Sequence, residues 1–120
     1  MPHELSMSGD GILRASLSGE IDRTVIDAFK KELDPFLEAA TTDAPAAIII
    51  DAHQAGTLSS YARRTLTSLN EDPRLGKVAL LSTSRRFKVF AGFVQKTTSR
   101  NNIKLFAQEQ PAAQWIKTND

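Results

Sequence analysis

Several residue types that support common kinds of functional site are absent or scarce in this chain of 120 residues. It has no cysteine, which excludes disulfides, zinc–thiolate sites, iron–sulfur clusters and cysteine nucleophiles. The start of the chain lacks the basic segment and apolar run of a signal peptide. No apolar stretch approaches the roughly 20 residues that span a bilayer. We therefore expect a cytoplasmic protein, since a chain without cysteine fits a reducing compartment.

The charge balance excludes a strong general attraction for polyanions. Lysine and arginine total 15, aspartate and glutamate total 14, and the net charge is +1. Any affinity for an anionic surface must then come from a local patch, and no recognisable RNA- or DNA-binding module is present. We expect no nucleic-acid partner. The length suits a single domain over residues 1–120.

The hydrophobic pattern predicts nine secondary-structure elements. Gly9-Asp10-Gly11 lies between two alternating segments and predicts a hairpin, whereas the continuous apolar runs are typical of strands covered on both faces. The expected strands are 3–8, 12–18, 46–52, 77–82 and 103–106. The expected helices are 23–40, 60–70, 85–98 and a last one that starts at Pro111 and docks through Ala112, Trp115 and Ile116.

Several boundaries follow from single residues. Asp22 is expected to cap the first helix, and Pro35 to kink or restart it. Residues 52–58 are expected to form a loop or bend, and Asn101-Asn102 to turn the chain. The element order predicts an α/β fold, a mixed and mostly parallel sheet of four or five strands with an N-terminal hairpin, covered by about four helices.

The stretch TLSSYARRTL places two serines at a helix start. Ser59 or Ser60 can cap the helix. A helix N-terminus also favours negative charge, so the same place can bind an anion. A phosphate on Ser60 could recruit Arg63 or Arg64. Cap, anion site and phosphorylation site therefore remain three interpretations.

Six motifs spread over nearly the whole chain carry a family resemblance. They are SGEIDR, IIIDA, LSSYARR, KVALLSTSRRFKVFAGFVQK, NNIKLF and AAQWIK. On these segments the chain resembles the STAS domain, the fold of bacterial anti-sigma-factor antagonists (SpoIIAA-like). It looks most similar to the small stand-alone branch grouped with lipid-transfer (CRAL-TRIO-like) folds.

The resemblance implies a non-catalytic binding or regulatory module without a cofactor. In the family, the first serine of an Asp-Ser-Ser-Gly motif is phosphorylated by the partner kinase, and that position corresponds to Ser60. Ser59 stands where the family has Asp, and Tyr61-Ala62 stand where it has Ser-Gly. Intact-mass spectrometry of protein from its own host would reveal such a phosphate.

The expected site lies where strands of a parallel sheet end, because loops that follow strand ends commonly hold ligands. We expect a protein partner, or a small anionic or lipid-like ligand, to dock at the 53–60 and 82–88 loops. The residues expected to bind it are Ser59, Ser60, Arg63, Ser84, Arg85 and Arg86.

The segment 84–100 carries five positive charges and no acid. Its apolar residues follow the helical period, with Val89, Phe90, Phe93 and Val94 expected to face inward and Thr97 to continue the stripe. A basic amphipathic helix can instead lie on an anionic membrane. In that alternative Phe87, Phe90, Phe93 and Val94 would face the lipid, and binding to anionic vesicles at low salt would check it.

Catalysis and metal binding find little support. Asp51, His53 and Ser60 suggest a hydrolase triad, but the Gly-x-Ser-x-Gly nucleophile motif is absent. Loss of ester hydrolysis in Ser60→Ala would check that alternative. His3 and His53 lack the cluster of about four ligands that zinc needs, so we expect both on the surface and no metal. A homodimer through an exposed helix face remains a further expectation.

Overall fold

The computed structural model describes residues 3–9, 11–97 and 102–118, and only the backbone of His3 and Thr97. Within these residues, strands and helices occur in the predicted order. The strands are β1 (His3–Met7), β2 (Leu13–Ile21), β3 (Ala46–Leu58), β4 (Leu75–Leu81) and β5 (Ile103–Phe106). The helices are α1 (Arg23–Ala39), α2 (Ser60–Asn70), α3 (Arg85–Thr97) and α4 (Glu109–Lys117).

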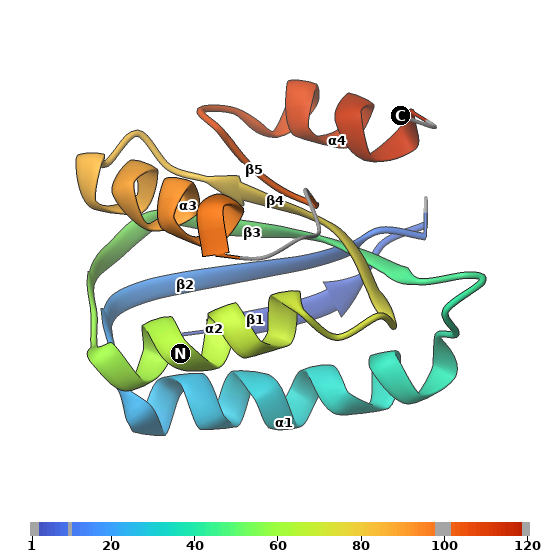
Figure 1. Cartoon of the computed structure of the whole chain (residues 1–120), viewed down its shortest axis with the longest axis horizontal. Coiled ribbons are helices and arrows are strands. Elements are labelled where there is room, and N and C mark those ends of the chain that lie inside the picture. The colour runs from blue at the N-terminus through green and yellow to red at the C-terminus, as the bar shows by residue number, and fades with distance from the viewer. Residues whose placement is uncertain (1–2, 10, 98–101, 119–120) are drawn as a thin grey trace.

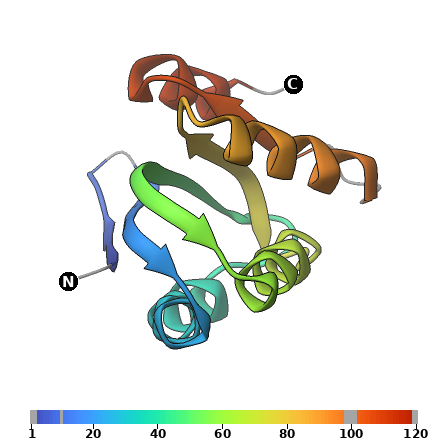
Figure 2. The same cartoon turned by 90° about the vertical axis from the view of Figure 1, so that its left-hand side faces the viewer.

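The five strands form one sheet in the order β1-β2-β3-β4-β5, with β1 antiparallel to β2 and the other pairs parallel. The mixed, mostly parallel α/β sheet is therefore confirmed. Each helical connection between parallel strands leads to the next strand of the sheet, always toward β5. Since such crossovers are right-handed, α1, α2 and α3 all lie on one face, and α4 covers the other (Figures 1 and 2).

Side-chain alternation along β3 divides the core into two parts. Ile48 and Ile50 face the large cluster under α1, α2 and α3, whereas Ile49 faces the smaller cluster under α4. A strand buried on both faces explains the unbroken apolar run of the sequence. The predicted docking of α4 through Ala112, Trp115 and Ile116 is confirmed.

Strand β3 is longer than predicted. The prediction of a loop at 52–58 is wrong, because the strand continues to Leu58. Its second half pairs with the end of β2, in the register Ser18 with Gln54 and Ile21 with Leu58, across two irregularities. Gly19, between them, has φ +70°, a value that favours glycine. The extension therefore depends on a pairing partner far away in sequence.

Pro35 does not restart helix α1, which runs unbroken from Arg23 to Ala39. Proline removes one backbone hydrogen bond, to the carbonyl of Lys31. Both residues are exposed, so water can reach that carbonyl. The predicted cap is confirmed, since the backbone N–H of Val25 donates to Oδ1 of Asp22 at 3.1 Å.

Helix α3 buries part of the face predicted for it: Phe90 and Val94 face inward as expected, but the helix is rotated so that the other two predicted side chains do not. Its buried side chains are Phe87, Phe90, Ala91 and Val94. Val89 and Phe93, both expected to face inward, are 64% and 57% exposed. The helix lies against the β5 side of the sheet, so these two side chains fall beyond the contact with the sheet.

Some expectations concern residues outside the described part of the chain. They are Asp10 of the hairpin turn, Asn101 of the later turn, Arg100 of the basic segment and the side chains of His3 and Thr97. Among the helices that are described, none has both the length and the apolar character needed to cross a bilayer.

Candidate functional site

The helices α2 and α3 both begin where parallel strands end, and serines form each junction. The hydroxyl of Ser59 accepts a hydrogen bond from the backbone N–H of Ala62 at 3.0 Å. At the second junction, Oγ of Ser84 accepts from the N–H of Arg86 at 3.2 Å, and Oγ of buried Ser82 accepts from Ser84 at 3.0 Å. Ser59 and Ser84 are therefore helix caps.

We expect Ser59→Ala to lower the free energy of unfolding by about 1 kcal/mol, because it removes the cap of α2. Ser60→Ala is the matched control. Ser60 is exposed, and its hydroxyl accepts from the Arg63 side chain while Ser59 holds the cap, so we expect a change within about 0.5 kcal/mol. Urea unfolding measures both. An equal or larger loss in Ser60→Ala would contradict the assignment of the cap.

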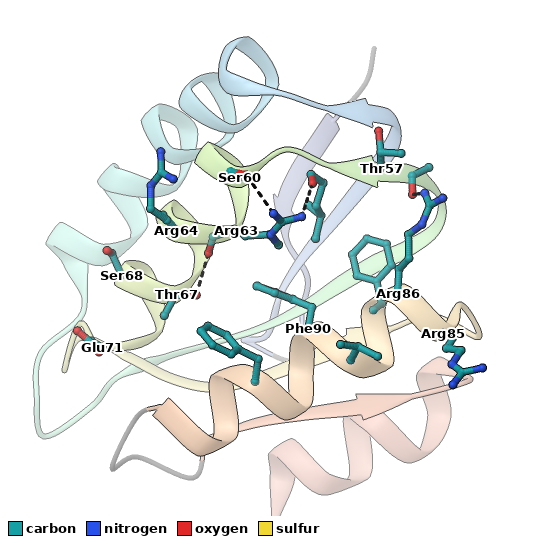
Figure 3. A pocket seen from close by; sticks show the side chains of 15 residues that line it. Thr57, Ser60, Arg63, Arg64, Thr67, Ser68, Glu71, Arg85, Arg86 and Phe90 are labelled. Atoms are coloured by element: carbon teal, nitrogen blue, oxygen red, sulfur yellow. Dashed lines mark hydrogen bonds between the residues drawn. The ribbon is translucent and has the colours of Figure 1, made fainter.

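Two arginines, one from each helix, bind the end of β3. Arg63 donates from Nη1 to the carbonyl of Leu58 and from Nη2 to Oγ of Ser60, both at 3.0 Å. Arg86 donates from Nη1 to the carbonyl of Gly56 at 3.2 Å. Both guanidinium groups therefore lie near the end of β3 (Figure 3). A phosphate on Ser60 would sit beside Arg63, although that modification stays a prediction.

A groove of about 1110 Å³ separates α2 from α3. The two helices stand apart on the same face of the sheet (Figures 2 and 3). The end of β3 closes one side of the groove through Gly56, Thr57 and Leu58. The groove therefore begins at the strand ends, where the sequence predicted a site, and continues along both helices.

The two walls of the groove differ in chemistry. The α2 wall is hydrophilic and follows the helical spacing i, i+3, i+4 over the whole helix. It consists of Ser60, Arg63, Arg64, Thr67, Ser68 and Glu71. The α3 wall is basic at its start and apolar beyond it. It consists of Arg85, Arg86, Phe87, Val89, Phe90 and Phe93.

Tyr61 follows Ser60 directly but does not line the groove. Its hydroxyl donates to Oδ1 of Asp27 on α1 at 2.6 Å. The guanidinium carbon of Arg23 lies 4.3 Å from the ring centroid, within cation–π range. The ring is therefore held against α1, and its bulk leaves the groove open.

Four of the six expected binding residues line the groove, namely Ser60, Arg63, Arg85 and Arg86. Ser59 and Ser84 do not; their hydroxyls serve the helix ends. In Figure 3 Arg63 and Arg86 point toward β3, while Arg64 and Arg85 lie toward the outer margins.

Sequence reasoning named Arg64 only as a contact for a phosphate and the phenylalanines of α3 only as core or lipid-facing positions, and it missed Thr67, Ser68 and Glu71 entirely. Helical spacing from Ser60 would have found the α2 residues, since 60, 63, 64, 67, 68 and 71 share one face. No sequence signal could have shown that α3 stands away from that face.

The geometry around Ser60 does not resemble a hydrolase triad. Oδ1 of Asp51 accepts a hydrogen bond from the backbone N–H of His53 at 3.0 Å. The carboxylate therefore contacts the main chain of His53. Oγ of Ser60 contacts the Arg63 guanidinium, a cation that cannot take its proton. Within residues 3–9, 11–97 and 102–118, no group of three or more histidine or acidic side chains could hold a metal.

Comparison with known proteins gave matches among solved structures. No family model matches the sequence, and no curated protein matches it. An uncharacterized protein of the DUF3478 family with a SpoIIAA-like fold, from Shewanella loihica PV-4, superposes with a TM-score of 0.72 at 18% identity. The match covers 94% of this chain and 90% of that chain.

Two further matches are anti-sigma factor antagonists. One, from Mycobacterium paratuberculosis, has a TM-score of 0.71 at 20% identity over 97% of this chain and 93% of its own. The other is SpoIIAA in its unphosphorylated form, with a TM-score of 0.67 at 17% identity over 96% of this chain and 97% of its own. In element order, sheet topology and near-complete coverage, the protein has the SpoIIAA-like fold of the STAS domain.

Proposed function

We propose that this protein is a non-catalytic regulatory module that docks a protein partner in the groove between α2 and α3. One observation carries the proposal: Val89 and Phe93, two of its large exposed apolar side chains, both line that groove. Apolar side chains gathered on a concave surface mark a site of interaction, whereas scattered ones need no explanation.

The fold supports a protein partner over other occupants. Two solved structures with this fold are described as antagonists of an anti-sigma factor, which is itself a protein. The volume of the groove, about 1110 Å³, also exceeds the range of about 300–1,000 Å³ that is usual for small-molecule pockets. An open groove of this size suits part of another protein better than a small anionic or lipid-like ligand.

Peripheral membrane binding would require a rearrangement of α3. Three of the four side chains expected to face lipid, Phe87, Phe90 and Val94, are buried in the core. They would reach a membrane only if the helix left the sheet and exposed its core face to water. A protein partner can use Val89 and Phe93 with the helix in place.

A photo-crosslinking amino acid at position 89 tests the proposal in cells of the protein's own host. The same amino acid at position 30, on the exposed face of α1, is the matched control. We expect one protein to crosslink from position 89 and not from position 30. That protein, purified, should then form a complex with this chain in solution.

Equal crosslinking from both positions, or none from position 89, would contradict the proposal. So would a lipid that remains bound through native mass spectrometry and fills the groove.

A further inference from the structure

We infer that the segment of the partner held in this groove is an amphipathic α-helix with acidic side chains along one side. The inference rests on the proposed function, because it specifies the partner's chemistry. It follows from three properties of the groove: the elements that form its walls, the difference between those walls, and its charge.

The walls favour a helix over an extended segment. An extended β-strand peptide satisfies its backbone N–H and C=O groups by adding to an exposed sheet edge. Most of the lining belongs to α2 and α3, whose backbones are already hydrogen bonded within each helix. A helix satisfies its own backbone and needs only side-chain contacts from the groove.

The dimensions fit a helix of about three turns. The α2 wall runs from Ser60 to Glu71, which at about 1.5 Å per residue is roughly 16 Å. On α3, the groove-facing positions Arg86, Val89, Phe90 and Phe93 follow the spacing i, i+3, i+4, i+7. Such a row can receive apolar side chains that recur at the same spacing on a docked helix.

Because one wall is hydrophilic and the other apolar, a segment bound between them needs one polar and one apolar face. Val89 and Phe93 on α3 offer an exposed apolar surface, while α2 opposes it with hydroxyls and arginines. A helix lying between them would place an apolar stripe against α3 and a polar stripe against α2.

The charge of the groove selects an acidic polar stripe. Its lining carries four arginines and one glutamate, a net charge of +3, whereas the whole chain carries only +1. Arg63 and Arg86 already bind carbonyls of β3. Arg64 and Arg85 are exposed and extend along the margins, where carboxylates of a docked helix could reach them.

A second copy of this chain is a poor occupant. Two such grooves facing each other would bring like charges together. The most acidic helix of the chain, α1, buries its apolar stripe of Val25, Ile26, Phe29, Leu33 and Leu37 in its own core. Its exposed face mixes acids with Lys30 and Lys31. The fitting helix therefore belongs to another protein.

Three synthetic peptides of about 11 residues test the inference, since that length makes the helix of about three turns that the groove accommodates. The first carries leucines at i, i+3, i+4 and i+7 with glutamates beside them. The second replaces each glutamate with lysine, and the third scrambles the order of the first. We expect the first to bind at least about tenfold more tightly than either other peptide. Amide chemical-shift changes should gather at Thr67 and Phe93, which line opposite walls.

A charge exchange makes the test specific to the groove. Arg64→Glu with Arg85→Glu should weaken binding of the acidic peptide about tenfold and reverse the preference toward the lysine peptide. Both side chains are exposed and lie near the starts of their helices, Arg85 as the first residue of α3 and Arg64 as the fifth of α2, so glutamate is tolerated at both. Lys30→Glu with Lys31→Glu changes the net charge equally and should leave affinity within about twofold, because α1 lies outside the groove.

Equal binding of the acidic and lysine peptides would overturn the inference, and so would equal binding of the scrambled peptide. If no peptide binds while a partner still crosslinks at position 89, the proposed function stands and the helical occupant is refuted. If both fail, the proposed function is refuted as well. Displacement of the acidic peptide by vesicles of phosphatidylglycerol and phosphatidylcholine would assign the groove to lipid instead.

Discussion

Replacing Phe93 with glutamate is expected to weaken partner binding by at least about 30-fold, the loss that corresponds to a hot-spot contribution of about 2 kcal/mol. The phenylalanine ring is 57% exposed and lines the groove, so a partner can bury it. Glutamate removes that apolar contact and places a carboxylate against the apolar stripe that we infer for the partner's helix. Titration calorimetry with the crosslinked partner measures the change.

Met7→Glu is the matched control for that variant. Met7 is another large exposed apolar residue, 48% exposed on β1 and absent from the groove lining. We expect Met7→Glu to bind the partner within about twofold of the parent protein, and Phe93→Glu to keep its free energy of unfolding within about 0.5 kcal/mol. Binding of Phe93→Glu with unchanged affinity would show that the partner docks elsewhere.

Replacing Phe87 with alanine is expected to lower the free energy of unfolding by about 3–5 kcal/mol. Phe87 is 1% exposed and belongs to the large core cluster under α1, α2 and α3. Its loss removes apolar burial and leaves a cavity beside the start of α3. A free energy of unfolding of about 0.05–0.15 kcal/mol per residue amounts to about 6–18 kcal/mol for this chain. The expected loss is therefore a substantial fraction of the total stability. Urea or thermal unfolding measures it.

Phe93→Ala provides the control for that measurement, since it makes the same chemical change on the same helix at an exposed position. We expect it to cost less than about 1 kcal/mol. The comparison also bears on membrane binding. If Phe87→Ala cost as little as Phe93→Ala, helix α3 would be weakly held, and its release from the sheet toward a membrane would regain support.

These two phenylalanines illustrate what local pattern can and cannot predict. The period of the apolar residues located α3, whose described part is Arg85–Thr97, because amphipathicity is a property of neighbouring positions. It also placed Phe93 inward, which is wrong. The rotation of the helix depends on where β5 and the sheet lie, and these contacts are distant in sequence.

Strand β3 and the serine pair also show which features follow from local sequence and which depend on tertiary contacts. The apolar run 46–52 predicted a strand, but its polar continuation to Leu58 was missed, because pairing with β2 holds it in place. Local sequence placed a cap at Ser59 or Ser60. The backbone path selected Ser59 and left Ser60 exposed beside Arg63.

Short-range features of the sequence, namely periodicity, turn residues and helix-start chemistry, predicted the order and type of the elements, the sheet class and the capping residues. The family resemblance added the fold, which the solved structures confirm. The groove did not follow from either. Its existence requires α2 and α3 to stand apart on one face of the sheet, and that spacing arises because α2 packs on β3 and β4 whereas α3 packs on β5. Ser60, Arg63 and Arg86 meet there only because β3 and β4 run parallel and end at the same edge.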